Sequence, residues 1–221
     1  MPQAGAESVT KMYLENFSEQ SKALMILAHG AGAPMDSPFM EDFTKRLVGK
    51  GISVVRFEFP YMGERRTLNR KRPPDRQPVL LECWRQMVSR YAHVQPLFIG
   101  GKSMGGRMAT ILAAEDLPIK GVVALAYPFH PPGKPDRLRI DHLGQMRCPA
   151  LVVQGERDPF GRPEEVAHYE LPSFLQVQWI PQGDHDLQPP KRSGLSYGEN
   201  LDLAVASVNG FVDRCIAGES E

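Results

Sequence analysis

The chain has 221 residues, 42% of them hydrophobic, which is enough for one sizeable core, and we expect a single domain over residues 1–221. Its 26 lysines and arginines balance its 26 aspartates and glutamates, which excludes a strong overall field that would attract nucleic acid or an anionic membrane. The first residues do not read as a secretory signal, and no apolar run approaches the ~20 residues needed to span a bilayer. We therefore expect a cytoplasmic protein with no nucleic-acid or membrane partner.

The three cysteines, Cys83, Cys148 and Cys215, are widely spaced and form no Cys-x-x-Cys pair. That spacing favours reduced thiols over a zinc site or a redox pair. The sequence offers no other ligand set for a metal and no phosphate-binding loop. We expect neither a metal nor an organic cofactor.

From about residue 23 the chain alternates short apolar runs with helical periodicity, a pattern typical of repeated βα units around a parallel sheet. Parallel strands that are buried on both faces read as continuous apolar runs. Weak alternation over residues 9–17 indicates an edge strand before them. The continuous runs predict strands at residues 24–29, 53–59, 97–100, 121–127, 150–154 and 175–180.

Helices are predicted in the intervals between these strands. Apolar residues recur at the i, i+3, i+4 spacing over residues 39–48 and 80–91, after residue 104, and over residues 201–215. Two segments, 61–78 and 128–149, are expected to be loops, rich in arginine and in proline respectively. The sequence thus predicts a mostly parallel sheet of about six or seven strands flanked by helices.

Residues 101–105 read Gly-Lys-Ser-Met-Gly and match the Gly-x-Ser-x-Gly nucleophile elbow, between a predicted strand and a predicted helix. The turn in this motif is tight, so the residues beside the serine must be small. It would expose the hydroxyl of Ser103 and direct the first free amide of the helix, that of Met104, into the same space. Because the pattern also occurs by chance in loops, its interpretation depends on partner residues.

A serine nucleophile needs a histidine base, which a carboxylate orients, and with this elbow the chain order is serine, acid, histidine. His168 lies in the charged segment 163–170, which reads as a surface helix. His185 instead follows the strand at 175–180, on the kind of loop that carries catalytic side chains. We therefore expect His185 to be the base.

The expected acid is Asp158, which follows the strand at 150–154, because active-site groups of parallel sheets collect at the carboxyl ends of strands. Glu156 remains an alternative in the same turn. Asp184 and Asp186 are too close in sequence to His185 to orient its ring.

The loop after the first buried strand is expected to supply a second oxyanion donor, the amide of Ala31. His29 in the same loop is interpreted as structural. The sequence therefore predicts two backbone donors, those of Ala31 and Met104, around one reacting oxygen.

Candidate substrate-binding residues are Arg65, Arg72 and His130. The first two lie in the segment 61–78, whose six basic and two acidic residues carry a local charge of 6 − 2 = +4. Arginines in this arrangement could receive a carboxylate or a phosphate. A solvated surface loop is the simpler interpretation, and both interpretations stay open.

These motifs together resemble the α/β-hydrolase superfamily, and within it a compact bacterial branch of KANL/Tex type, which shares a domain with a testis-expressed protein and a histone-acetyltransferase complex subunit. The chain is similar, more distantly, to dienelactone-hydrolase-like enzymes, which have a cysteine where this chain has Ser103. The resemblance covers nearly the whole chain and implies an α/β-hydrolase fold. It rests on residues 29–32, 56–61, 100–107, 127–128, 154–158 and 184–185.

The residues predict a serine hydrolase that transfers the acyl group of a small ester or related carbonyl substrate through Ser103, His185 and Asp158. The alternative is a non-catalytic scaffold or binding protein with the same fold, since some members of the branch act as scaffolds. The intact set of three residues argues against it. Because 128–149 spans only about twenty residues, we expect no separate lid domain and an open site. The sequence leaves the acyl group, the leaving group and the oligomeric state open.

Overall fold

The computed structural model of the protein describes residues 12–218, which are built around a seven-stranded sheet. The strand order is β1-β3-β2-β4-β5-β6-β7, with β1 antiparallel to β3 and all other neighbours parallel. The strands are β1 (Tyr13–Asn16), β2 (Ala23–Ala28), β3 (Ile52–Phe57), β4 (Leu97–Lys102), β5 (Gly121–Leu125), β6 (Ala150–Gly155) and β7 (Leu175–Ile180). The helices are α1 (Pro38–Val48), α2 (Pro60–Leu68), α3 (Gln77–Tyr91), α4 (Met104–Leu112), α5 (Pro163–Val166) and α6 (Tyr197–Ala217).

The predicted mostly parallel sheet is therefore confirmed, as are its six predicted strands, β2 to β7. The strands β2 to β6 are buried along their whole length, and the edge strand β7 is partly exposed. The expected edge strand over 9–17 is β1, although residues 9–11 lie outside the described part of the chain. The predicted surface helix at 163–170 is shorter than expected, because only α5 is helical there.

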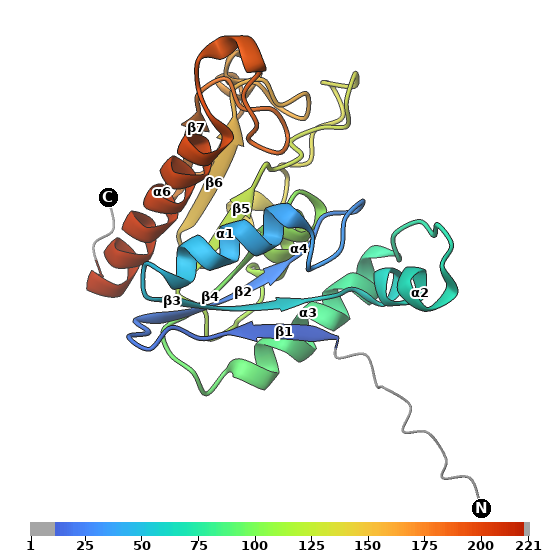
Figure 1. Cartoon of the computed structure of the whole chain (residues 1–221), viewed down its shortest axis with the longest axis vertical. Helices are drawn as coiled ribbons and strands as arrows, with labels where there is room; N and C mark the ends of the chain where they lie inside the picture. The colour runs from blue at the N-terminus through green and yellow to red at the C-terminus, as the bar shows by residue number, and fades with distance from the viewer. Residues whose placement is uncertain (1–11, 219–221) are drawn as a thin grey trace, which may run out of the picture.

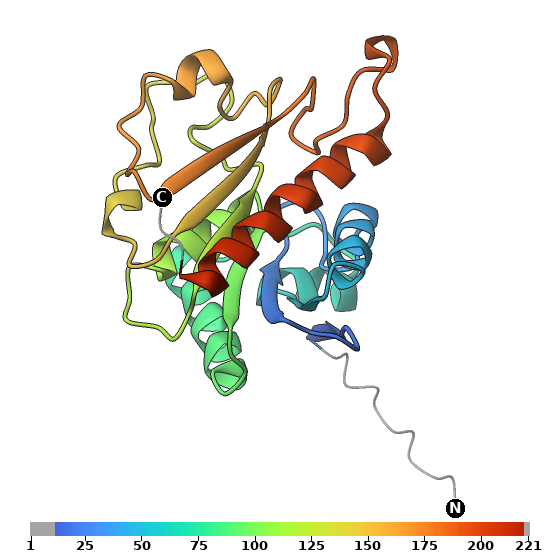
Figure 2. The ribbon, with the colours of Figure 1, turned by 90° about the vertical axis from the view of Figure 1, so that its left-hand side faces the viewer.

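The sheet is covered by helices on both faces (Figure 1). The helices α1 and α6 contact each other on one face, as the turned view in Figure 2 shows, while α3 and α4 pack on the opposite face. Successive residues of β2 alternate between the two cores: Ile26 faces α3 and α4, and Leu27 faces α1 and α6. This double burial explains why the strands read as continuous apolar runs.

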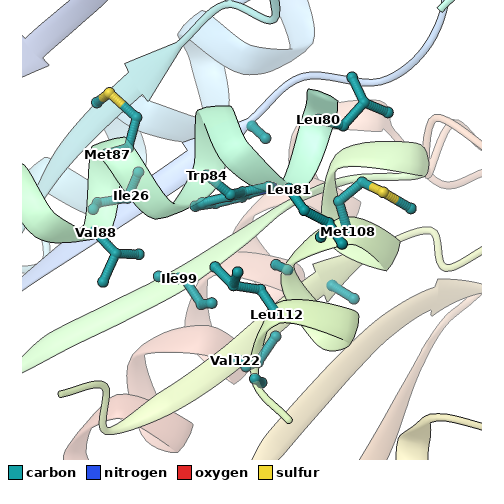
Figure 3. Close-up of a cluster of buried hydrophobic side chains, with 14 of the residues drawn as sticks. Ile26, Leu80, Leu81, Trp84, Met87, Val88, Ile99, Met108, Leu112 and Val122 are labelled. Atoms are coloured by element: carbon teal, nitrogen blue, oxygen red, sulfur yellow. The ribbon is translucent and has the colours of Figure 1, made fainter. Parts of the chain in front are cut away.

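The core between the sheet and α3 is centred on Trp84, a fully buried side chain. Figure 3 shows Trp84 among Leu81 of the same helix, Met108 of α4 and Ile26 of β2. The indole ring also meets Phe57 of β3 edge to face, with the ring centroids 4.7 Å apart. This packing anchors the two helices beside the nucleophile strand β4.

One loop prediction is wrong: the segment 61–78 contains most of α2. The helix begins at Pro60, whose fixed φ suits the first helical position. It ends at Leu68 and is capped by Asn69, which adopts a left-handed φ of 47°. Tyr61 and Met62 are its buried residues. Because these lie side by side in sequence rather than at helical spacing, the apolar pattern gave no periodic signal.

The other loop prediction is confirmed in its essential point. Between β5 and β6 the regular structure consists of one 3₁₀ turn, Leu143–Gln145, so residues 128–149 build no helical cap over the carboxyl ends of the strands. The site at those ends lies open. Within residues 12–218, no helix has the length and apolarity that crossing a membrane requires.

Candidate active site

The turn between β4 and α4 holds Ser103 in a strained conformation, with φ 50° and ψ −113°. Such a backbone costs of order 1–3 kcal/mol and persists only where the surroundings enforce it. Here they do, because the Ser103 N–H donates to the Leu125 carbonyl at 2.7 Å. A Cβ on Gly101 or Gly105 would lie only 2.4 or 2.6 Å from the Ala28 carbonyl oxygen. The expectation that the positions two residues before and two residues after the serine must be small is confirmed.

Three predicted residues meet above this turn in a continuous line of hydrogen bonds. His185 Nε2 lies 3.0 Å from Ser103 Oγ, and His185 Nδ1 lies 2.8 Å from Asp158 Oδ2. The bonds join residues 82 and 27 positions apart in the chain. The Phe160 ring lies against the imidazole, with centroids 4.3 Å apart and planes at 31°, and limits how far the imidazole can tilt.

The carboxylate of Asp158 is fully buried and held from both sides. Its Oδ1 accepts the Phe160 N–H at 2.9 Å, and its Oδ2 accepts the Gln154 side-chain amide at 3.1 Å as well as the histidine. Glu156, the alternative acid, instead accepts the Gln182 N–H at 2.8 Å and so tethers the chain after β7. The geometry therefore favours Asp158 over Glu156.

Gln154 was not identified from the sequence. Its side-chain amide also reaches the carbonyl oxygens of Tyr127 and Gly161, each at 3.2 Å, so it holds the turn after β6 as well as the acid. The available signal was a fully buried amide inside an otherwise apolar strand, which must find hydrogen-bond partners.

The loop after β2 carries the predicted oxyanion donor Ala31 and is held through the carbonyl of the preceding residue. The Gly30 carbonyl oxygen is bound by His29 Nδ1 at 2.7 Å and lies 3.3 Å from the Tyr61 hydroxyl. Across a planar trans peptide the next N–H points the opposite way, so the Ala31 amide is directed away from these groups. The Met104 amide opens α4 and has no intrahelical acceptor. Both predicted oxyanion donors thus keep free N–H groups.

His29 has a structural role in this geometry, as interpreted from the sequence. Its Nε2 accepts the Phe59 N–H at 3.1 Å, so Nδ1 carries the proton that the Gly30 carbonyl accepts. Burial lowers the pKa of His29 and keeps the ring neutral. The imidazole therefore ties the loop after β2 to the segment after β3.

A pocket of about 340 Å³ opens beside the serine and the histidine. Small and apolar residues form most of its wall, with Lys102 and Asp186 as the charged members. The pocket is lined by Gly30, Ala31, Gly32, Ala33, Ser37, Phe39, Met40, Lys102, Ser103, Phe160, His185 and Asp186.

The candidate substrate residues Arg65, Arg72 and His130 do not line this pocket. Arg65 Nη1 lies 3.5 Å from the Ala31 carbonyl oxygen in the loop after β2, while Arg72 pairs with acidic neighbours in its own segment. His130 is buried, with Nδ1 2.9 Å from the Pro131 carbonyl. Their role in binding an anionic substrate stays a prediction.

A larger cavity of about 490 Å³ lies elsewhere, between β3, α2 and α3. Phe57, Val79, Cys83 and Met87 are among its lining residues, and burial raises the pKa of Cys83 to about 11. None of the candidate catalytic residues lines it, so chemistry rather than size identifies the pocket at Ser103 as the candidate active site. Within residues 12–218 no group of three His, Cys, Asp or Glu side chains is placed to hold a metal ion.

Comparison with known proteins identifies the family and the fold of this chain. A family model described as an alpha/beta hydrolase domain matches residues 21–213. Est1E from Butyrivibrio proteoclasticus with ferulic acid bound is similar over 93% of this chain and 95% of its own, at 17% identity and a TM-score of 0.66. A serine hydrolase without a lid from Xanthomonas campestris shares 18% identity over 93% and 87% of the chains, with a TM-score of 0.65.

Dienelactone hydrolase from Anabaena variabilis is similar to the same extent, with 19% identity over 91% of this chain and 88% of its own and a TM-score of 0.66. At such identities the likeness shows a common fold. The assignment of chemistry has to come from the residues of this chain.

Proposed function

This chain belongs to the α/β-hydrolase family, and on that premise we propose that it is a serine hydrolase acting by acyl transfer on a small ester or related carbonyl compound. The observation that carries the proposal is the hydrogen-bonded line from Ser103 through His185 to the buried carboxylate of Asp158. A fold alone does not select an activity. A strained serine beside a base and an oriented acid has a specific chemical use.

In the first half of the reaction, Ser103 Oγ attacks the carbonyl carbon while its proton passes to His185 Nε2. Asp158 accepts the hydrogen bond from Nδ1–H and stabilises the imidazolium that forms. The negative oxygen of the tetrahedral intermediate receives the N–H groups of Ala31 and Met104. His185 then returns its proton to the leaving oxygen as the bond to the acyl carbon breaks.

The second half releases the acyl group to water. His185 takes a proton from the water as its oxygen attacks the acyl carbon, and a second tetrahedral intermediate forms against the same two amides. When this intermediate collapses, the proton returns from Nε2 to Ser103 Oγ. The products are a carboxylic acid and the free enzyme.

We propose short acyl groups as substrates, because the 340 Å³ pocket has small walls and no cap covers it. A methylene buried in an apolar channel gains ~0.8 kcal/mol, equivalent to roughly fourfold in kcat/KM. A methylene left in water gains little.

The string at residues 100–107 further supports membership of the compact KANL/Tex-type branch, and we propose that residues 1–221 form one cytoplasmic hydrolase domain.

The test is labelling with a small uncharged fluorophosphonate, which reacts with an activated serine whatever the natural substrate. We expect the wild-type protein to be labelled at Ser103 and Ser103→Ala to be unlabelled. A folded wild-type protein that is not labelled would instead favour a scaffold or binding protein with this fold. Labelling that persists in Ser103→Ala would assign the wrong nucleophile.

A series of aryl esters from acetyl to decanoyl tests the substrate class. We expect kcat/KM to be flat or to decline with chain length. A steep rise of about fourfold per methylene would reveal a deep acyl channel and contradict the proposed open site.

A further inference from the structure

Lys102 is a buried cation in the wall of the candidate active site, and the mechanism above gives it no role. It is the last residue of β4, and its side chain is only 9% exposed. Its ammonium lies 3.1 Å from Asp186 Oδ1 and 5.3 Å from the centroid of the Phe39 ring. Burial lowers the pKa of Lys102, and the Asp186 carboxylate opposes that shift. A buried cation is costly, so its contacts need an explanation.

The most telling contact joins the Lys102 ammonium to the backbone carbonyl of His185, across 83 positions of the chain. Two other side chains hold the rest of this loop. Asp184 Oδ1 accepts the N–H groups of Asp186 at 2.8 Å and of Gln188 at 3.0 Å. The Leu187 carbonyl accepts the Asn200 side-chain amide at 2.8 Å. The peptide carbonyl of the base itself is bound by Lys102.

Lys102 and Ser103 are consecutive, so this bond connects the nucleophile turn directly to the residue that must deprotonate it. The imidazole is fixed at one end by Asp158 and at the other by the serine. Neither bond restrains the His185 peptide directly, which leaves it some freedom to shift within a loop that its own backbone and side-chain bonds hold. A shift of about 1 Å in a catalytic group can cost about a hundredfold in rate. A tether on the His185 peptide removes that freedom.

We propose that Lys102 is a positioning residue, which holds the His185 backbone at the distance from Ser103 that proton transfer requires. The inference rests on the proposed serine hydrolase function. It predicts that Lys102 acts on the rate of the chemical step and has little effect on the affinity for the reacting molecule. Asp186 neutralises the ammonium, so the tether adds no net charge to the pocket.

The experiment measures inactivation of the full-length protein by a small uncharged fluorophosphonate over a range of concentrations. This separates the limiting rate constant, kinact, from the apparent dissociation constant, KI. We expect Lys102→Met to lower kinact by about 10–100-fold, because a displacement of up to about 1 Å in a catalytic group can cost about a hundredfold in rate. KI should stay within about threefold, because Lys102 acts through His185. Lys102→Arg, which can still donate to the carbonyl, should recover part of the rate.

The matched control is Lys50→Met, which should leave kinact unchanged. Lys50 is an exposed lysine just before β3, at the amino ends of the strands and so at the end of the sheet away from the candidate active site. Lys102→Gln guards against misfolding of the Met variant: its polar side chain is one atom too short to reach the carbonyl, so it should show the same loss. A wild-type kinact in both Lys102→Met and Lys102→Gln, or a loss of affinity that appears in KI, would overturn the proposal. A wild-type protein that is not labelled at Ser103 would instead refute the serine hydrolase function.

Discussion

The nucleophile turn, residues 100–106, and the base loop, residues 183–188, face each other across the candidate active site but are held in different ways. The turn is fixed by backbone atoms, with Gly101 packed against the Ala28 carbonyl and the Ser103 N–H bonded to Leu125. The base loop is fixed by side chains as well as by backbone bonds: Lys102 binds the His185 carbonyl, Asp184 binds two N–H groups, and the Arg157 N–H donates to the Gly183 carbonyl at 2.8 Å. The position of the serine therefore depends on backbone packing between neighbouring strands, whereas that of the histidine depends on side-chain contacts as well.

The largest expected effect concerns the side-chain contacts of the base. We predict that Asp158→Asn lowers kinact with a fluorophosphonate by about 10⁴-fold, equivalent to about 5.5 kcal/mol, because an amide at this position favours the wrong tautomer of His185. The fold should persist, since the amide has nearly the same shape. The measurement is the inactivation rate together with a circular dichroism spectrum.

Glu156→Gln is the matched control, because Glu156 lies in the same turn and bonds to the Gln182 N–H instead of to the histidine. It should retain a rate close to that of the wild type. A crippled Glu156→Gln beside a nearly normal Asp158→Asn would mean that the acid has been wrongly assigned.

The second prediction concerns the backbone packing of the nucleophile turn. A Cβ on Gly101 would lie 2.4 Å from the Ala28 carbonyl and 2.9 Å from the Gly105 carbonyl carbon, and neither backbone group can move aside. We expect Gly101→Ala to lower the free energy of unfolding by about 3 kcal/mol or more, measured by urea denaturation. Gly144→Ala should cost far less, because nothing lies within 4 Å of a Cβ there. Equal stability of the two variants would show that the turn yields easily.

The same contrast explains how much of the site could be predicted. The small residues around Ser103 form a local pattern in the sequence, although the backbone that requires them includes the Ala28 carbonyl of β2, which leaves no room for a side chain at Gly101 or Gly105. His185 and Asp158 could be located only through strand order, by which the carboxyl ends of parallel strands meet. Gln154, which supports them, was missed because one amide in an apolar run forms no motif. The bond from Lys102 to the His185 carbonyl was missed because it joins residues 83 positions apart and leaves no spacing in the sequence.

The fold follows the same division. The strands β2 to β6 were predictable because burial on both faces makes each of them a largely apolar run. The edge strand β7 is only partly buried and alternates apolar residues with Gln176 and Gln178. The helix α2 was missed because its two buried residues, Tyr61 and Met62, follow each other. Its stability comes from tertiary contacts, such as the hydrogen bonds from the Tyr61 hydroxyl to the carbonyls of the loop after β2. Regular burial is visible in sequence, whereas a short element held by tertiary contacts is not.

The smallest expected effect concerns His142 and tests whether the nucleophile turn, with the helix α4 that follows it, also depends on a side chain. His142, in the segment between β5 and β6, packs against α4, with Nε2 2.9 Å from Thr110 Oγ1 and 3.4 Å from the Tyr127 hydroxyl. Burial, with a smaller contribution from the Arg107 cation, lowers its pKa to about 4, against which Asp141 acts weakly. The neutral ring is therefore the one that fits the folded protein.

Because the folded-state pKa of His142 lies below the unfolded value of about 6.5, the unfolded chain binds the proton more readily. The stability that His142 contributes is thus fully present above about pH 6.5 and is lost as the pH falls toward 4. Allowing for partial exposure, we expect the wild-type protein to lose about 1 kcal/mol more than His142→Gln between pH 7 and pH 5, measured by urea unfolding. Gln keeps a donor for Thr110 but does not titrate, so its curve should be flatter. Parallel curves for the two proteins would mean that protonation of His142 does not lower the free energy of unfolding. Backbone packing alone would then hold the nucleophile turn and α4.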